Sequence, residues 1–219
     1  MNYLEMSTLL PISWRFTHNY HRCKDLVEAA DGLMNRSIAG DSLPDDLRRA
    51  AVLLAHATLE DLIRSLAEVR LPLADAKHLK TIPLLVEEET TRGPRYDLSD
   101  LAFYREQPVG EVIRRSVIAH LAGVTYNSVG QLALALDQIG LPRNLLEGYG
   151  GEFAAMMTRR HHIAHRADRN EENGGGDPMF RAIESDTVQG WIEAVFRFGD
   201  AVIGALSTSS ISIDPGRDT

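Results

Sequence analysis

A cluster of basic side chains, three histidines and three arginines, lies between Arg159 and Arg166. The whole chain has a formal net charge of -8, so this cluster is a local positive segment in an acidic protein. Histidine has the unperturbed pKa nearest to physiological pH and can accept or donate a proton there. Arginine stays charged and places two N–H groups on phosphate oxygens. The cluster therefore has the groups that cleavage of a phosphodiester needs, a proton carrier and a partner for developing negative charge.

Helical periodicity sets Arg160 apart from its neighbours. At 100° per residue, the apolar residues between Phe153 and Ala167 form one stripe, and Arg160 falls near its centre. An arginine in that place needs a carboxylate partner or a water-filled cleft. If its role is structural, we expect Glu60 or Asp61 to be that partner.

The flank of the same stripe carries His161, His165 and Asp168, which stack on a helix at intervals of four and three residues. Two histidines and a carboxylate in this order are a plausible metal-binding set, although no second cluster completes it. The other basic side chains are expected to face solvent or a partner: Arg159, His162, Arg166 and Arg169.

The spacing Arg160-x4-His165 resembles the R-x4-6-H motif of the HEPN superfamily, and Arg159-x5-His165 also fits the spacing. Two further segments are similar to the RiboL-PSP-type HEPN group. They are residues 50–66 (AAVLLAHATLEDLIRSL), which resemble its early core helix, and residues 125–142 (TYNSVGQLALALDQIGLP), which keep its order of elements. The resemblance covers roughly residues 14–207.

The resemblance implies a metal-independent endoribonuclease of a toxin or defence system. Such an enzyme attacks phosphorus with the RNA 2′-OH and leaves a 2′,3′-cyclic phosphate. It implies a homodimer in which each chain supplies Arg160 and His165, with His161 orienting the phosphate or His165, and it requires no cofactor. An antitoxin or regulatory partner is also expected. The residues that we expect to bind RNA or to support the site are Arg159, His162, Arg166, Asp168 and Glu60.

Two alternatives remain open beside the ribonuclease. One is a non-catalytic dimeric module that binds RNA or protein, as some members of the superfamily do. The other is a helix-borne metal site of His161, His165 and Asp168. One departure from the family is informative: Ala167 stands where HEPN toxins controlled by nucleotidyltransferases have a tyrosine, so that form of control is not expected.

Composition predicts an ordinary globular protein. At 219 residues, with 44% hydrophobic and 25% charged residues, the chain can form one domain with a real core. The single cysteine, Cys23, offers no disulfide framework and suits a reducing compartment. We see no secretory signal and no apolar run long enough to span a bilayer. We therefore expect a cytoplasmic protein without a membrane partner.

The pattern of apolar residues predicts an all-α fold. We expect one helical domain over residues 1–207, a long irregular insertion around 70–98, and a disordered tail over 208–219. Within the domain, six helices beside a short one at about 98–105 are expected: about 13–36, from Ser42 through Leu66, about 109–122, from Asn127 or Ser128 to Gly140, about 144–166, and about 187–206.

Overall fold

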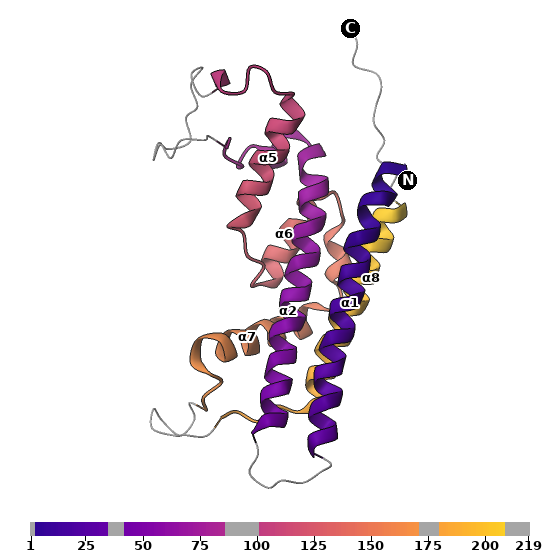
Figure 1. Cartoon of the computed structure of the whole chain (residues 1–219), viewed down its shortest axis with the longest axis vertical. Coiled ribbons are helices and arrows are strands. Elements are labelled where there is room, and N and C mark those ends of the chain that lie inside the picture. The colour runs from indigo at the N-terminus through magenta and orange to yellow at the C-terminus, as the bar shows by residue number, and fades with distance from the viewer. Residues whose placement is uncertain (1–2, 35–41, 86–100, 171–179, 209–219) are drawn as a thin grey trace.

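The chain folds into helices, in agreement with the predicted all-α class (Figure 1). The computed structural model describes residues 3–34, 42–85, 101–170 and 180–208, and within these ranges it contains no β-strand beyond one isolated bridge between Arg169 and Phe180. The helices are α1 (Tyr3–Met34), α2 (Leu43–Arg70), α3 (Ala76–Leu79), α5 (Val109–Ala122), α6 (Val129–Gln138), α7 (Gly150–Arg166) and α8 (Ser185–Thr208), with short 3-10 turns at Leu71–Leu73 and Arg143–Leu146. None of these described helices combines the length and apolar character needed to cross a bilayer.

The first helix begins at Tyr3, about ten residues before the predicted start near residue 13, and Pro11 lies inside it. A proline in a helix interior removes one backbone hydrogen bond and normally ends the helix. Here Leu9, Ile12 and Phe16 are buried on the same face, and their packing against the core stabilises the extra turns. Met34, the last residue of α1, is 55% exposed. The end predicted near residue 36 lies outside the described residues.

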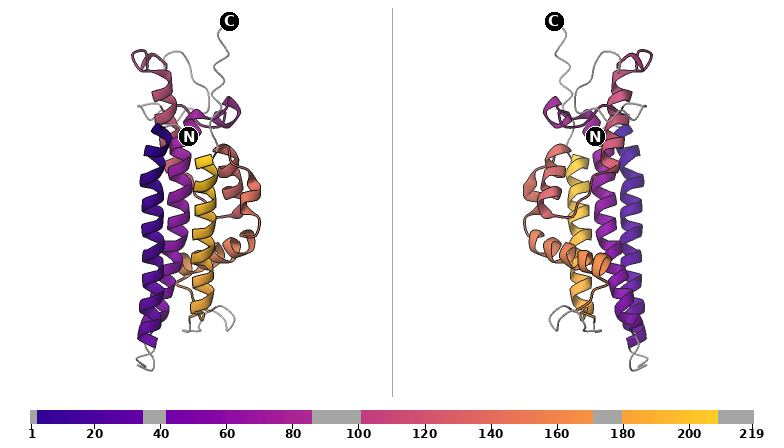
Figure 2. Two further views of the ribbon diagram at one scale, coloured as in Figure 1. Left: turned by 90° about the vertical axis from the view of Figure 1, so that its right-hand side faces the viewer. Right: turned by 90° about the vertical axis from the view of Figure 1, so that its left-hand side faces the viewer.

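The second helix forms the centre of the bundle. It starts after Ser42, as predicted, with Pro44 in its first turn. The stripe expected to be buried is buried throughout: Val52, Ala55, Leu59, Leu62, Ile63 and Leu66. The helices α1 and α8 pack along α2, and the three long helices lie side by side in both orientations of Figure 2.

The predicted irregular insertion around residues 70–98 is partly helical where the structure describes it. The turn at Leu71–Leu73 and the short helix α3 follow directly on α2, and Leu71 is buried in the core. Residues 86–100 lie outside the described part of the chain. Of the predicted tail, Thr208 is the last residue of α8, and residues 209–219 are not described.

The helix that carries the histidines is shorter than predicted at its start. It begins at Gly150 rather than near Asn144, because Gly148 has a left-handed backbone with φ of 85° and separates it from the preceding 3-10 turn. Figure 1 shows α7 running across α2 rather than along it. Phe153, Met156 and Met157 anchor this crossing in the core. The second half of α7 is thereby projected from the side of the bundle.

Candidate functional site

The two adjacent arginines of α7 have different environments, and Arg159 is held by the protein itself. Its Nη2 donates to Asp168 Oδ2 at 2.6 Å, to the carbonyl oxygen of Arg181 at 3.0 Å and to that of Ala182 at 3.0 Å. The prediction that Arg159 faces solvent or a partner is therefore wrong. Through Nη2 it fastens the segment after α7 to the helix itself, whereas its buried Nε has no hydrogen-bond partner in the described structure.

The position of Asp168 also differs from the prediction. The helix ends at Arg166, and Ala167 and Asp168 both take left-handed backbone conformations with φ of 48° and 56°. This reversal moves Asp168 off the histidine flank and into the protein, where it is 0% exposed. There its Oδ2 also accepts a hydrogen bond of 2.8 Å from Arg49 Nε of α2. Asp168 is thus the shared anion of a buried two-arginine cluster.

The placement of Asp168 separates the three residues of the metal alternative. His161 and His165 remain together, but the carboxylate points into the arginine cluster. Over the described ranges, no group of three histidine, cysteine, aspartate or glutamate side chains is arranged to hold a metal ion. That alternative assumed that the helix continues to Asp168, whereas α7 ends at Arg166, two residues earlier.

A pocket of about 800 Å³ collects the three predicted catalytic residues, Arg160, His161 and His165. The two histidines are exposed, and their ring centroids are 4.7 Å apart. The remaining described lining residues come from α7 and from the start of α6, and none of them is a carboxylate: Asn127, Ser128, Val129, Gly130, Ala154, Met157 and Thr158. The pocket is therefore basic in a protein whose overall charge is negative.

The half-buried Arg160 has no bonded partner within the described residues. Its guanidinium group makes no hydrogen bond and no ion pair there. The two carboxylates that we expected as structural partners are used elsewhere. Asp61 Oδ2 accepts from Arg15 Nε at 2.7 Å, and Glu60 Oε1 accepts from the backbone N–H of Tyr126 at 2.9 Å.

The loop that leads into α6 is fastened to α2 by side chains of α2. Besides the bond from Tyr126 to Glu60, Arg64 donates to the carbonyl oxygens of Leu121 and Val124, and its guanidinium lies over the Tyr126 ring. Ser128 caps α6 by accepting from the N–H of Gln131, as the sequence predicts. The supporting role expected of Glu60 is therefore to hold the loop that forms one wall of the pocket.

A buried histidine of α2, His56, lies near Glu60, and its residue type and spacing alone did not indicate a function. It is only 1% exposed, and its Nδ1 lies 3.6 Å from Glu60 Oε2. Burial lowers the pKa of His56, the Glu60 carboxylate opposes that shift, and the positive charge of Arg160 adds to it. The signal for this pair was present in the sequence, since His56 and Glu60 are four residues apart beside the buried stripe of α2.

The last two predicted supporting residues lie on the final turns of α7. His162 is half-buried, and its Nδ1 is enclosed without a hydrogen-bond partner in the described part of the chain. Arg166 is exposed beside His165 at the end of the helix. Of these two residues, only Arg166 is exposed enough to contact a large ligand.

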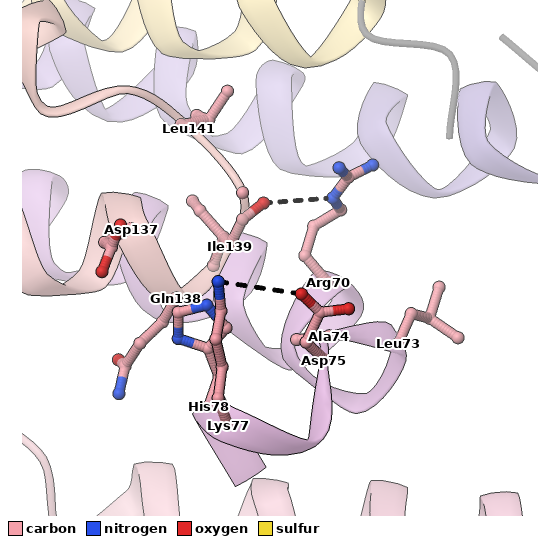
Figure 3. Close-up of a pocket in the computed structure, with 11 residues that line it drawn as sticks. Arg70, Leu73, Ala74, Asp75, Lys77, His78, Asp137, Gln138, Ile139 and Leu141 are labelled. Carbon is pink, nitrogen blue, oxygen red and sulfur yellow. Dashed lines mark hydrogen bonds and ion pairs between the residues drawn. The ribbon is translucent and has the colours of Figure 1, made fainter. Parts of the chain in front are cut away.

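A second pocket, of about 410 Å³, lies between the end of α2, α3 and the end of α6 (Figure 3). Figure 3 shows Lys77 pointing at Asp75, at 3.7 Å, and Arg70 Nε donating to the carbonyl oxygen of Ile139 at 3.4 Å. This pocket has basic and acidic side chains in its wall, and its carboxylates oppose an anionic ligand. The pocket around Arg160 is therefore the better candidate site.

Comparison with models of protein families, with curated proteins and with solved structures gave no match to this chain.

Proposed function

We propose that this chain is a metal-independent endoribonuclease that binds the RNA backbone in the pocket around Arg160. The observation that carries the proposal is the half-buried guanidinium of Arg160, which has no bonded partner among the described residues and lines a pocket without carboxylates. A buried charge is normally paired. A phosphate group is the anion that would complete this site, because it accepts two parallel N–H bonds from arginine.

The proposed reaction is an in-line attack within the RNA. A histidine removes the proton from the 2′-OH, the 2′ oxygen bonds to the adjacent phosphorus, and the bond from phosphorus to the 5′ oxygen breaks. A second proton carrier protonates the departing 5′ oxygen, which leaves a 2′,3′-cyclic phosphate and a 5′-hydroxyl. His165 is the proposed base or acid, and Arg160 stabilises the pentacoordinate phosphorus.

Further groups around the pocket have supporting roles in this proposal. His161, with its ring next to that of His165, orients the phosphate or His165. The first backbone N–H groups of α6, at Val129 and Gly130, have no partner within the helix, and helix N-termini favour anions. The exposed Arg166 extends the basic surface along the RNA. Arg159 and Asp168 act indirectly, by fixing the end of α7.

We further propose that the chain is a HEPN-type protein of a toxin or defence system, controlled by an antitoxin or another regulatory partner. The all-α fold and the pairing of Arg160 with His165 in one pocket support this proposal. Ala167 stands where a tyrosine would permit control by nucleotidyl transfer, so the regulator is expected to act by binding.

We expect the protein to be a dimer whose two α7 helices share one cleft. In-line displacement needs proton carriers on opposite sides of phosphorus, whereas His161 and His165 project from one helix face. The exposed surface of α7 beside them carries the small side chains of Ala154, Ala155 and Thr158, which allow a second helix to approach closely. Analytical sedimentation should give the mass of two chains. A monomer at tens of micromolar would contradict the proposal of a shared cleft.

We expect purified protein to cut RNA in the presence of EDTA, because proton transfer and charge stabilisation in this site need no metal. The measurement is incubation of end-labelled RNA, followed by detection of cyclic-phosphate ends. If cleavage stops with EDTA and returns with zinc or manganese, a metal-dependent reaction replaces the proposed one. If the protein binds RNA with no cleavage, the non-catalytic dimeric module replaces it.

A further inference from the structure

His56, the buried histidine of α2, lies next to the proposed site, and the proposed reaction gives it no role. The His56 side chain is 1% exposed and its Nε2 has no hydrogen-bond partner in the described structure. An unpartnered buried polar atom lowers the stability of the folded protein. Such a cost is usually tolerated where the group has a role beyond packing.

The surroundings of His56 indicate which nitrogen carries the proton. Desolvation by burial lowers the pKa of His56, so the neutral imidazole is the expected form at neutral pH. Its Nδ1 faces the Glu60 carboxylate at 3.6 Å, and an N–H toward a carboxylate is favoured over a lone pair. This arrangement favours the tautomer with the proton on Nδ1, in which Nε2 is a hydrogen-bond acceptor.

The groups that face His56 come from three elements and all belong to the site. Glu60 is on its own helix, the backbone of Tyr126 in the loop before α6 raises the pKa of His56 through a hydrogen bond, and the charge of Arg160 on α7 lowers it. Arg160 is the cation among them, and its guanidinium has no bonded partner within the described residues. The charge of Arg160 acts on the imidazole of His56, and the contacts of Glu60 with His56 and with Tyr126 place that imidazole next to the pocket wall.

We propose that His56 is a positioning residue for Arg160. On this view, which rests on the proposed function, the Nε2 of His56 accepts one N–H of the guanidinium when a phosphate occupies the pocket. The opposite edge of the same planar group then donates to two phosphate oxygens. Because the guanidinium fork is rigid, fixing one edge fixes the direction of the other. Glu60 fixes the imidazole and, through Tyr126, the pocket wall.

Two substitutions separate positioning from packing. His56→Leu keeps the volume but removes the acceptor, and we expect kcat for RNA cleavage to fall at least tenfold with KM changed less than about threefold. A misplacement of about 1 Å can cost about 10²-fold in rate. His56→Gln keeps an acceptor near the position of Nε2 and should recover most of the loss. Thr58→Val, at a buried polar residue two positions along α2, is the matched control and should leave kcat unchanged.

A double variant of His56 and Arg160 gives a second test. In Arg160→Ala protein, His56→Leu should lower cleavage no further, because its effect passes through Arg160. Losses that multiply, or a folded His56→Leu protein with wild-type kcat, would overturn the inference. An equal loss in His56→Gln and His56→Leu would also overturn it, since that pattern indicates packing.

Binding of inorganic phosphate tests the same pair without catalysis. In protein with ¹⁵N-labelled histidine, phosphate should shift the Nε2 resonance of His56 in the wild type and not in Arg160→Ala. The resonance is assigned by its absence from His56→Gln. A shift in a protein that cuts no RNA would support the pair and remove the ribonuclease proposal. No shift in a protein that does cut RNA would exclude the positioning role of His56 and leave the ribonuclease proposal standing.

Discussion

Replacing His165 by alanine is expected to lower RNA cleavage by about 10²–10⁴-fold, the usual contribution of general acid–base catalysis. Arg160→Ala is expected to lower it by about 10²–10³-fold, because the charge on the pentacoordinate phosphorus loses its donor. Arg160→Lys should not restore activity, since a lysine cannot place two parallel N–H bonds on the phosphate. Single-turnover cleavage of labelled RNA measures all three.

Controls for these variants come from the exposed surface of α1. His21→Ala and Arg22→Ala remove the same residue types outside the pocket and should keep wild-type rates. Unfolding curves on the same samples establish that each variant is folded. A folded His165→Ala protein with full ribonuclease activity would exclude the catalytic role of His165, and the interaction module would then explain the pocket better.

Replacing Asp168 by alanine is expected to lower the free energy of unfolding by about 3–5 kcal/mol. It leaves Arg159 without a carboxylate partner in the described structure and leaves Arg49 with only the exposed Asp46 as its anion. The side chains of Arg49 and Arg159 are 9% and 17% exposed, and that of Asp168 is 0% exposed. Solvent cannot replace the lost carboxylate at such a site. Urea unfolding monitored by circular dichroism measures the change.

The matched control is Asp61→Ala. Its ion pair with Arg15 has a similar distance, 2.7 Å, but both side chains are more than 40% exposed. Solvent screens such a pair, and its loss should cost no more than about 1 kcal/mol. A similar loss of unfolding free energy in Asp61→Ala and Asp168→Ala would show that the buried cluster stabilises the fold no more than an exposed ion pair does.

Substitution of the two adjacent arginines of α7 is expected to have different effects on stability and on activity. Arg159→Ala breaks three hydrogen bonds to Asp168 and to the segment before α8, so it should lower stability. Arg160→Ala breaks no bond that the described structure contains, so it should lower activity and leave stability nearly unchanged. The pair therefore separates folding from function at neighbouring positions.

Much of the fold follows from local periodicity. The stripe of α2 from Val52 to Leu66 predicts a buried face, and the structure buries it. Ser128 is a helix cap by its residue type and by its place before an apolar run, and it caps α6. These predictions succeed because amphipathic spacing and capping depend on residues within one or two turns of each other.

Periodicity fails where the backbone departs from a helix or where packing overrides propensity. Asp168 was placed by extending α7 at 100° per residue, but two left-handed residues after Arg166 turn it toward α2. The first helix was predicted to start near residue 13, yet α1 starts at Tyr3, where burial of Leu9 and Ile12 keeps it continuous through Pro11. In both places the deciding partner is distant in sequence.

For the candidate site, the amino-acid sequence alone predicted Arg160 and His165 as a pair, and in the structure both line one pocket. Which of the two arginines is free for a ligand depends on the fold, because Arg159 is engaged by Asp168, whose second partner, Arg49, is 119 residues away from it. The same holds for His56, whose place beside Glu60 and Arg160 arises from the crossing of α7 over α2. Spacing along one helix reports which side chains share a face, whereas the partner of each side chain is set by contacts between helices.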